Sequence, residues 1–220
     1  MKQTANERPK LFVVPPLNVM SITSSPTPLK IVGSTPPRRP TNISIRSREH
    51  LLPEEVDAMR TAVRANRYGV RDEALIVVAY RHACRVAELV QIRWTDIDEV
   101  RNTITIHRVK RGPVTTHYMD PDELALIKKL PRVSDYVFLS ERGKQISKRM
   151  VHDIVANAGR AAELPLSVHP HMLRHARGFV LTNRGTDLRL IQEYFGHREI
   201  RSTMIYTTVS PNRFEGCEQG

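Results

Sequence analysis

The chain has 220 residues, of which 40% are hydrophobic, and it carries a formal charge of +11 with a pI of about 10.1. No apolar run is long enough to span a membrane, the N-terminus does not resemble a secretory signal, and Cys84 and Cys217 provide neither a disulfide framework nor a metal-ligand spacing. We therefore expect a cytoplasmic protein without a membrane anchor whose partner is polyanionic.

Residues 1–48 differ in composition from the rest of the chain. They contain eight of the fifteen prolines, and eight Lys and Arg side chains against Glu7 give them a charge of +7. Because such a segment buries too little apolar surface to fold, we expect a disordered basic arm. Two roles are open, since the arm either follows DNA phosphates or a minor groove, or is a solubilising tail. The remainder divides into a folded domain over 49–214 and a short tail over 215–220.

The folded part is expected to begin with two helices. Apolar residues repeat at helical spacing after Pro53, and a more apolar helix is predicted over 71–83, in the centre of the core. In the segment that follows, Leu89 and Ile92 are expected to be buried together with Trp94. The acidic residues at 96–98 are expected to turn the chain.

A change of apolar period then predicts a β element. From Thr103 the period is two, which indicates a hairpin with Gly112 and Pro113 at its turn. Further helices are expected after Asp120, and from the capping residue Ser147 to about residue 162. The predicted fold class is therefore mainly α with a small antiparallel β-hairpin or sheet.

Three helical segments are expected near the C-terminus. Pro170 can occupy the first turn of a helix that ends at Gly185 in a left-handed cap. A second helix is predicted over 187–195 and ends at Gly196. A short third helix is expected over 200–206.

Four reactive side chains should converge at these helices. His171 and Arg174, three residues apart, share one helical face, His197 lies on the turn after a glycine, and Tyr206 returns toward the same place. Arginine binds phosphate through a planar fork of donors, histidine transfers protons near neutral pH, and tyrosine can form a covalent intermediate. This set of side chains favours a phosphodiester as the electrophile.

The pattern His-x-x-Arg, Gly-His and a tyrosine nine residues later resembles the C-terminal motif of the tyrosine recombinases, the phage integrase family. The likeness extends from about residue 48 to 214, and HPHMLRH, DLRLIQEYFGHREIRST and YT most resemble the compact fimbrial phase-switch DNA invertases. It implies the catalytic-domain fold of that family. Larger members have a helical DNA-clamping domain before the catalytic one, which 48 proline-rich residues cannot supply.

The same resemblance assigns the remaining site residues. In CRVAELVQIRW it makes Arg85 the first phosphate-binding arginine and Glu88 the acidic residue that organises the site. In RVKRGPVTTH it nominates Lys110 as the lysine presented to the cleaved strand. Because hairpin register can shift by a residue or two, Arg108 and Arg111 are weaker candidates for the same role, and both are expected to bind DNA. Two positions depart from the family pattern, because its usual glycine is Ala83 here and its common serine is Ala87.

The reaction that the resemblance implies is site-specific recombination without metal or other cofactor. Tyr206 would form a 3′-phosphotyrosyl link, assisted by the residues at 85, 110, 171, 174 and 197. The implied partners are double-stranded DNA with short inverted repeats, three further copies of the chain in a homotetramer, and accessory DNA-bending proteins. The subtype implies inversion of a promoter-bearing segment that switches fimbrial genes.

Several alternatives remain beside this hypothesis. A zinc site at His169, His171 and His175 lacks a complete ligand set, and the acidic residues at 96–99 are not gathered as two-metal chemistry requires. A helix-turn-helix regulator over 186–207 explains the charge but not the six reactive residues in their order. A type IB topoisomerase shares the chemistry, although the short chain disfavours it. Cations outside the motif could contact DNA phosphates, but we favour solvated surface for all of them: Lys144, Lys148 and Arg149.

Overall fold

The computed structural model describes residues 48–109 and 112–207. The predicted N-terminal arm lies outside these residues except for Arg48, and the predicted tail over 215–220 lies outside them entirely. Within the described ranges, no helix combines the length and apolar character needed to cross a membrane.

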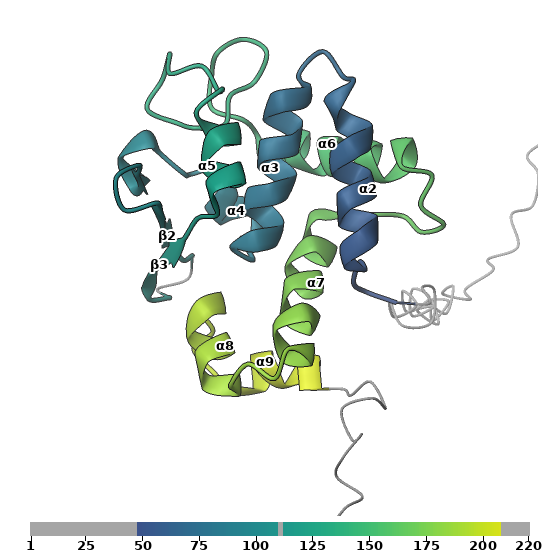
Figure 1. Cartoon of the computed structure of the whole chain (residues 1–220), viewed down its shortest axis with the longest axis vertical. Helices are drawn as coiled ribbons and strands as arrows, with labels where there is room; N and C mark the ends of the chain where they lie inside the picture. The colour runs from purple at the N-terminus through teal and green to yellow at the C-terminus, as the bar shows by residue number, and fades with distance from the viewer. Residues whose placement is uncertain (1–47, 110–111, 208–220) are drawn as a thin grey trace, which may run out of the picture. The chain divides into compact units, whose positions relative to one another are not determined.

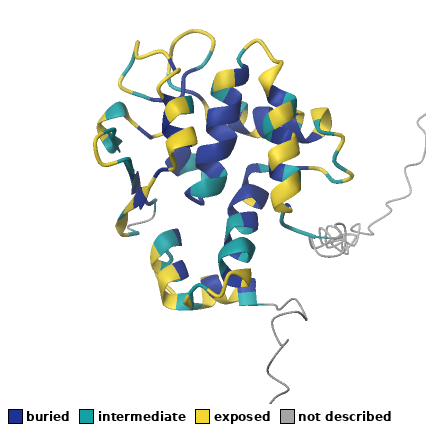
Figure 2. Ribbon diagram, in the orientation of Figure 1, coloured by how far each residue is buried: buried dark blue, intermediate teal, exposed yellow. Residues whose placement is uncertain are grey.

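Helix α3 (Gly69–Arg81) is the centre of the fold. It is buried along nearly its whole length, and it lies between α2 (Pro53–Arg64) and α5 (Pro121–Ile127), as Figures 1 and 2 show. The helix begins two residues earlier than predicted. A Cβ at Gly69 would lie 2.4 Å from the carbonyl oxygen of Arg64, so only glycine permits the tight turn from α2.

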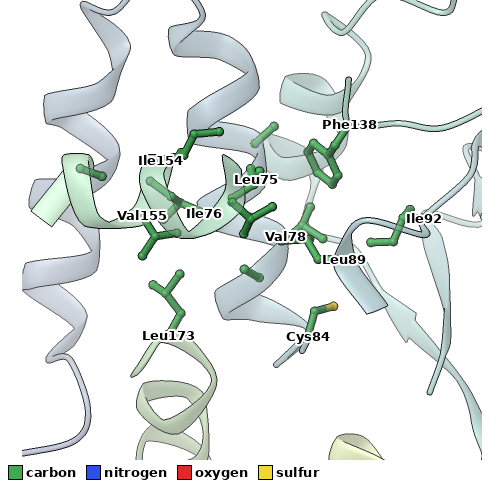
Figure 3. Close-up of a cluster of buried hydrophobic side chains, with 14 of the residues drawn as sticks. Leu75, Ile76, Val78, Cys84, Leu89, Ile92, Phe138, Ile154, Val155 and Leu173 are labelled. Carbon is green, nitrogen blue, oxygen red and sulfur yellow. The ribbon is translucent and has the colours of Figure 1, made fainter. Parts of the chain in front are cut away.

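The hydrophobic core forms where α3 meets the elements on either side of it (Figure 3). Helix α6 (Lys148–Ala161) packs against α2, and the short α4 (Val86–Leu89) closes one end of the core. The predicted burial of Leu89 and Ile92 is confirmed, whereas Trp94 is only partly buried where it packs against the core. Burial of these side chains is the main favourable term in folding. The labelled core residues are Leu75, Ile76, Val78, Cys84, Leu89, Ile92, Phe138, Ile154, Val155 and Leu173.

The predicted hairpin is confirmed as part of a three-stranded antiparallel sheet in the order β1-β2-β3. Strands β2 (Thr103–His107) and β3 (Val114–Tyr118) pair directly, with Gly112 in the connection between them. The turn predicted at 96–98 is wrong. A 3-10 turn, η1 (Trp94–Asp96), is followed by the edge strand β1 (Ile97–Asp98). Two residues are too few to produce a detectable strand period.

The C-terminal helices occur where the sequence predicted them. Helix α7 (Pro170–Asn183) packs on α3, and Gly185 beyond its end has a φ of +74°. Helix α8 (Leu188–Phe195) contacts β3, and α9 (Arg201–Met204) continues into the 3-10 turn η2 (Ile205–Thr207) beside α7, in the lower part of Figure 1. These packings bring the C-terminal segments to α4 and the hairpin.

Candidate active site

Glu88 is the acidic centre of the site. Arg85 precedes α4 in extended conformation. Glu88 accepts hydrogen bonds from the backbone N–H of Arg85 at 2.9 Å and from the guanidinium of Arg85 at 2.8 Å. It also accepts from Arg108 at 2.9 Å, and its side chain has no exposed surface. Burial alone would raise the pKa of Glu88, but the hydrogen bonds from Arg85 and the charge of Arg108 hold it below its usual value. Glu88 is thus a carboxylate that fixes the direction of Arg85.

Arg174 reaches the site from the buried face of α7. Its guanidinium donates to the carbonyl oxygens of Ala83 and Phe195 and lies 4.7 Å above the Phe195 ring. Burial, together with the charges of Arg85 and Arg108, lowers its pKa to about 10, so it remains a cation at neutral pH. Ala83 has a φ of +50°, a conformation that favours glycine. The turn at Ala83, a position where the family usually has glycine, directs the carbonyl oxygen of Ala83 at Arg174.

His197 follows the left-handed cap at Gly196, whose φ is +60°. Its Nε2 lies 2.9 Å from Arg174 and its Nδ1 lies 2.8 Å from the hydroxyl of Thr203. Because a guanidinium can only donate, Nε2 is the acceptor and Nδ1 bears the proton. Burial and the positive charge of Arg174 lower the pKa of His197 to about 3, so this imidazole is neutral.

His171 and His175 lie one turn apart on α7, with ring centroids separated by 4.4 Å in an edge-on arrangement. Burial, with smaller effects of neighbouring cationic groups, lowers each pKa to about 4. Both imidazoles are therefore neutral at physiological pH and able to accept a proton. No set of three or more His, Cys, Asp or Glu side chains within residues 48–109 and 112–207 is arranged to hold a metal ion.

Tyr206 is only 2% exposed, and its ring packs against Gly178. The rings of Phe179 and Phe195 lie 5.6 and 5.2 Å away. Burial raises the pKa of the phenol to about 12, although Arg174 and Arg85 act in the opposite direction. The predicted convergence holds for every described member of the set, because one cleft of about 270 Å³ is lined by Arg85, His171, Arg174, His175, His197, Ser202, Ile205 and Tyr206.

Comparison with known proteins identifies the family of proteins to which a chain with this cleft belongs. A family model described as "Phage integrase family" matches residues 49–213. The chain belongs to the phage integrase family. The resemblance seen in the sequence is confirmed, and the chain is a tyrosine-type site-specific recombinase.

The curated relatives agree with this membership. The "Type 1 fimbriae regulatory protein FimE" of Escherichia coli (strain K12) is 39% identical over 77% of this chain and 90% of its own length. "Type 1 fimbriae regulatory protein FimB" of the same strain is 36% identical over 78% of this chain and 90% of its own length. "Tyrosine recombinase XerC" of Bacillus subtilis (strain 168) is 33% identical over 64% of this chain and 50% of that protein.

Solved structures support the predicted fold. The crystal structure of XerA recombinase superposes with a TM-score of 0.67 at 23% identity, covering 83% of this chain and 65% of that one. XerH recombinase bound to palindromic difH substrate gives 0.65 at 23% identity, covering 77% and 52%. The chain thus spans about half to two thirds of these solved chains, and the shared part has the fold of tyrosine recombinase catalytic domains.

Three of the predicted site residues come from the segment that follows β2. Arg108, expected among the DNA-contacting residues, instead has a fully buried side chain paired with Glu88. The alternation that buries Ile104 and Ile106 continues to Arg108, a signal of its inward direction that the prediction of DNA contact did not use. Lys110 and Arg111 lie outside the described residues.

The remaining DNA-binding candidates lie on the surface of the recombinase. Lys148 and Arg149 are exposed in the first turn of α6, and Arg149 pairs with Asp153 at 3.1 Å. Neither residue lines the cleft at Tyr206. Lys144 is exposed as well.

Sequence reasoning missed two hydroxyl groups in this site. Thr203 is fully buried and holds Nδ1 of His197, and Ser202 lines both the cleft and an adjoining hollow of about 340 Å³. No local pattern marks either residue, because each acts only through the fold of α9 onto α8.

The helix-turn-helix alternative does not fit the C-terminal segment. Its second helix would be α9, which has four residues and, at about 1.5 Å per residue, extends only roughly 6 Å. A recognition helix must lie along a major groove and present several exposed side chains. In α9 the side chain of Thr203 is instead directed inward to His197.

Proposed function

We propose that this recombinase cleaves and rejoins DNA through Tyr206, and that it inverts a DNA segment between short inverted repeats. The observation that supports the chemistry is the shared cleft, in which two arginines, three neutral histidines and a buried phenol surround a space of about 270 Å³. This combination suits an anionic electrophile better than a neutral one.

In the proposed reaction the phenolate oxygen of Tyr206 attacks a backbone phosphorus. The bond from phosphorus to the 5′-oxygen breaks, which leaves a 3′-phosphotyrosyl link and a free 5′-hydroxyl. The 5′-hydroxyl of a second strand then reverses the step. Because one phosphodiester replaces another, the bond's free energy is retained in the intermediate and no external energy source is consumed.

The cations of the cleft would stabilise charge on the transferring phosphoryl group. Arg85 and Arg174 would bind the non-bridging oxygens, which is the main contribution in phosphoryl transfer. Lys110 would protonate the departing 5′-oxygen, because an alkoxide is a poor leaving group. Glu88 would keep Arg85 in place without reacting.

The phenol must lose its proton to become a nucleophile, and its pKa of about 12 makes a nearby acceptor necessary. We assign that role to His171, which is neutral at physiological pH. His197 would donate to the phosphate from Nε2 after its proton moves there from Nδ1. The Thr203 hydroxyl would then donate to Nδ1, since a hydroxyl serves in either direction.

Inversion is the reaction that the similarity to two fimbrial regulators favours. FimE and FimB are named as regulators of type 1 fimbriae, and each is matched over 90% of its length. We therefore propose that the DNA is a promoter-bearing segment, that four copies of the chain assemble on two repeats, and that accessory proteins bend the DNA.

Covalent trapping tests the chemistry. The protein is incubated with a nicked duplex that carries inverted repeats from near its own gene, in the presence of chelator, and is then denatured. We expect a protein–DNA adduct from the wild type and none from Tyr206→Phe. Tight binding with no adduct from either protein would instead favour a DNA-binding regulator.

Plasmid substrates test the outcome of recombination. We expect inversion when two repeats are inverted on one plasmid, with little joining of separate plasmids. Efficient joining of two plasmids would favour an integrase. Relaxation of supercoiled DNA that lacks the repeats would favour a topoisomerase.

A further inference from the structure

A buried polar cluster lies behind the recombination site and has no part in the reaction proposed above. It consists of ionisable side chains from the end of α3, the hairpin and its connection, and α5, and each residue is at most 6% exposed: His82, Arg108, His117 and Glu123. Burying charged groups costs free energy unless they are paired and hydrogen-bonded. The partners of each group in this cluster therefore show which segments it holds together.

The cluster forms a chain of hydrogen bonds with one consistent direction. Arg108 lies 3.5 Å from Nε2 of His117, whose Nδ1 lies 3.2 Å from Nδ1 of His82, and Nε2 of His82 lies 2.8 Å from Glu123. Because the guanidinium can only donate, Nε2 of His117 accepts, Nδ1 of His117 donates to His82, and His82 donates to the Glu123 carboxylate. The two histidines are neutral in this arrangement, and the cluster connects a cation to an anion.

Arg108 also contacts three segments beside the site. Its NH1 donates to Glu88 at 2.9 Å, and its NH2 donates to the carbonyl oxygens of His82 and Tyr194. Glu88 in turn holds Arg85. The guanidinium therefore ties the α4 turn, the end of α3 and the C-terminal end of α8 to one point.

Two glycines allow the stem of Arg108 to lie this close. A Cβ at Gly196 would lie 2.5 Å from Cγ of Arg108, and a Cβ at Gly112 would lie 2.8 Å from its Cβ. Gly196 immediately precedes His197, and Gly112 is in the connection between β2 and β3. The side chain is thus enclosed by the hairpin connection on one side and the turn that bears His197 on the other.

We propose that Arg108 is a positioning residue of the recombinase, which fixes Glu88 and the Gly196–His197 turn and thereby directs Arg85 and His197 at the scissile phosphate. This inference rests on the proposed function. The planar fork of the guanidinium matches the task, because two of its nitrogens point at different acceptors at fixed angles. A lysine keeps the charge but supplies one flexible donor group, so it cannot hold both segments.

The first test is Arg108→Lys, with Arg160→Lys at an exposed position of α6 as the matched control. The rate of Tyr206 adduct formation at saturating nicked duplex is measured separately from the dissociation constant for that duplex. We expect the rate to fall on the order of a hundredfold, the cost of a small misplacement of a catalytic group. The dissociation constant and the control should change less than about threefold, since neither change touches the phosphate.

A substrate with a neutral methylphosphonate at the scissile position separates positioning from general damage to the fold. Removing the negative charge makes the cleavage less dependent on Arg85, so the defect of Arg108→Lys should become at least tenfold smaller on this substrate. An equal defect on both substrates, or no defect at all, would overturn the proposal. Rescue instead by a 5′-bridging sulfur, a better leaving group, would assign Arg108 to the support of Lys110 and would also overturn it.

A second variant keeps the test decisive when Arg108→Lys does not fold. His117→Gln removes the ring beside Arg108 while the ion pair with Glu88 is retained. We expect His117→Gln to slow adduct formation less than Arg108→Lys does, and we expect this defect also to shrink on the methylphosphonate substrate. Adduct formation at the wild-type rate would count against the proposal. Failure of the wild type to form any adduct would refute the proposed function itself, so the two failures remain distinguishable.

Discussion

Arg174 and His197 bind each other across the cleft, with the guanidinium 2.9 Å from Nε2 of the imidazole. Both groups are assigned to the scissile phosphate in the proposed reaction. Each group therefore provides a hydrogen-bond partner for the other, so neither the buried Arg174 nor the partly buried His197 is left unsatisfied. In the proposed reaction a phosphate oxygen takes the place of this contact.

Arg174→Lys should impair both catalysis and stability. A lysine cannot reach Ala83, Phe195 and His197 together, so we expect adduct formation to slow on the order of a hundredfold or more. The unmet carbonyl groups should lower the free energy of unfolding by about 1–3 kcal/mol. Denaturant titration and single-turnover adduct assays measure the two effects. Arg184→Lys, at the exposed end of α7, is the control.

Gly178→Ala should displace the nucleophile. Alanine normally stabilises a helix interior by roughly 0.5–1 kcal/mol relative to glycine, but here the new Cβ would lie 2.5 Å from the Tyr206 ring. We expect slower adduct formation and no gain in stability. In a Tyr206→Ala background the same substitution should stabilise the protein, and this double-mutant cycle isolates the contact. A gain of equal size in both backgrounds would contradict the packing argument.

The free energy of unfolding should fall as the pH is lowered from about 6.5 toward 4. Burial lowers the pKa of several histidines below the ordinary value of 6.5, so the unfolded chain binds protons in this range while the native state does not. Denaturant titrations at pH 7.5, 6.5, 5.5 and 5.0 measure the slope. Unchanged stability between pH 7 and 5 would show that these rings titrate normally. The lowered pKa values are about 2 for His117, about 3 for His197, and about 4 for His171 and His175.

Lys110→Ala should block cleavage of an ordinary duplex at the departure of the 5′-oxygen. We expect a rate loss on the order of a hundredfold or more, since general acids contribute about that much. A 5′-bridging sulfur leaves without protonation and should restore most of the rate. Arg111→Ala is the matched comparison, because it removes a neighbouring cation to which the proposed reaction assigns no proton transfer. If Arg111→Ala slows cleavage more than Lys110→Ala and the 5′-bridging sulfur restores its rate, protonation of the 5′-oxygen is assigned to Arg111 in place of Lys110.

The sequence alone determined all the longer helices, the hairpin and most of the cleft, but not the short helix α4. Helical periods with Pro170 and Gly196 at their ends predict the C-terminal elements, and these local signals act within a few residues. The spacing of His171, Arg174, His197 and Tyr206 predicted that they would meet, because helical geometry and one left-handed turn fix their directions.

Only the tertiary structure decided which polar groups lie behind the cleft. Arg108 looked like a surface cation because a charged residue in a hairpin is usually solvated. Its burial depends on Glu88, 20 residues away in the chain, and on glycines at 112 and 196. The contact between Thr203 and His197 likewise depends on how α9 packs onto α8. A sequence pattern reports the faces of single elements, whereas the pairing of buried charges depends on how separate elements pack.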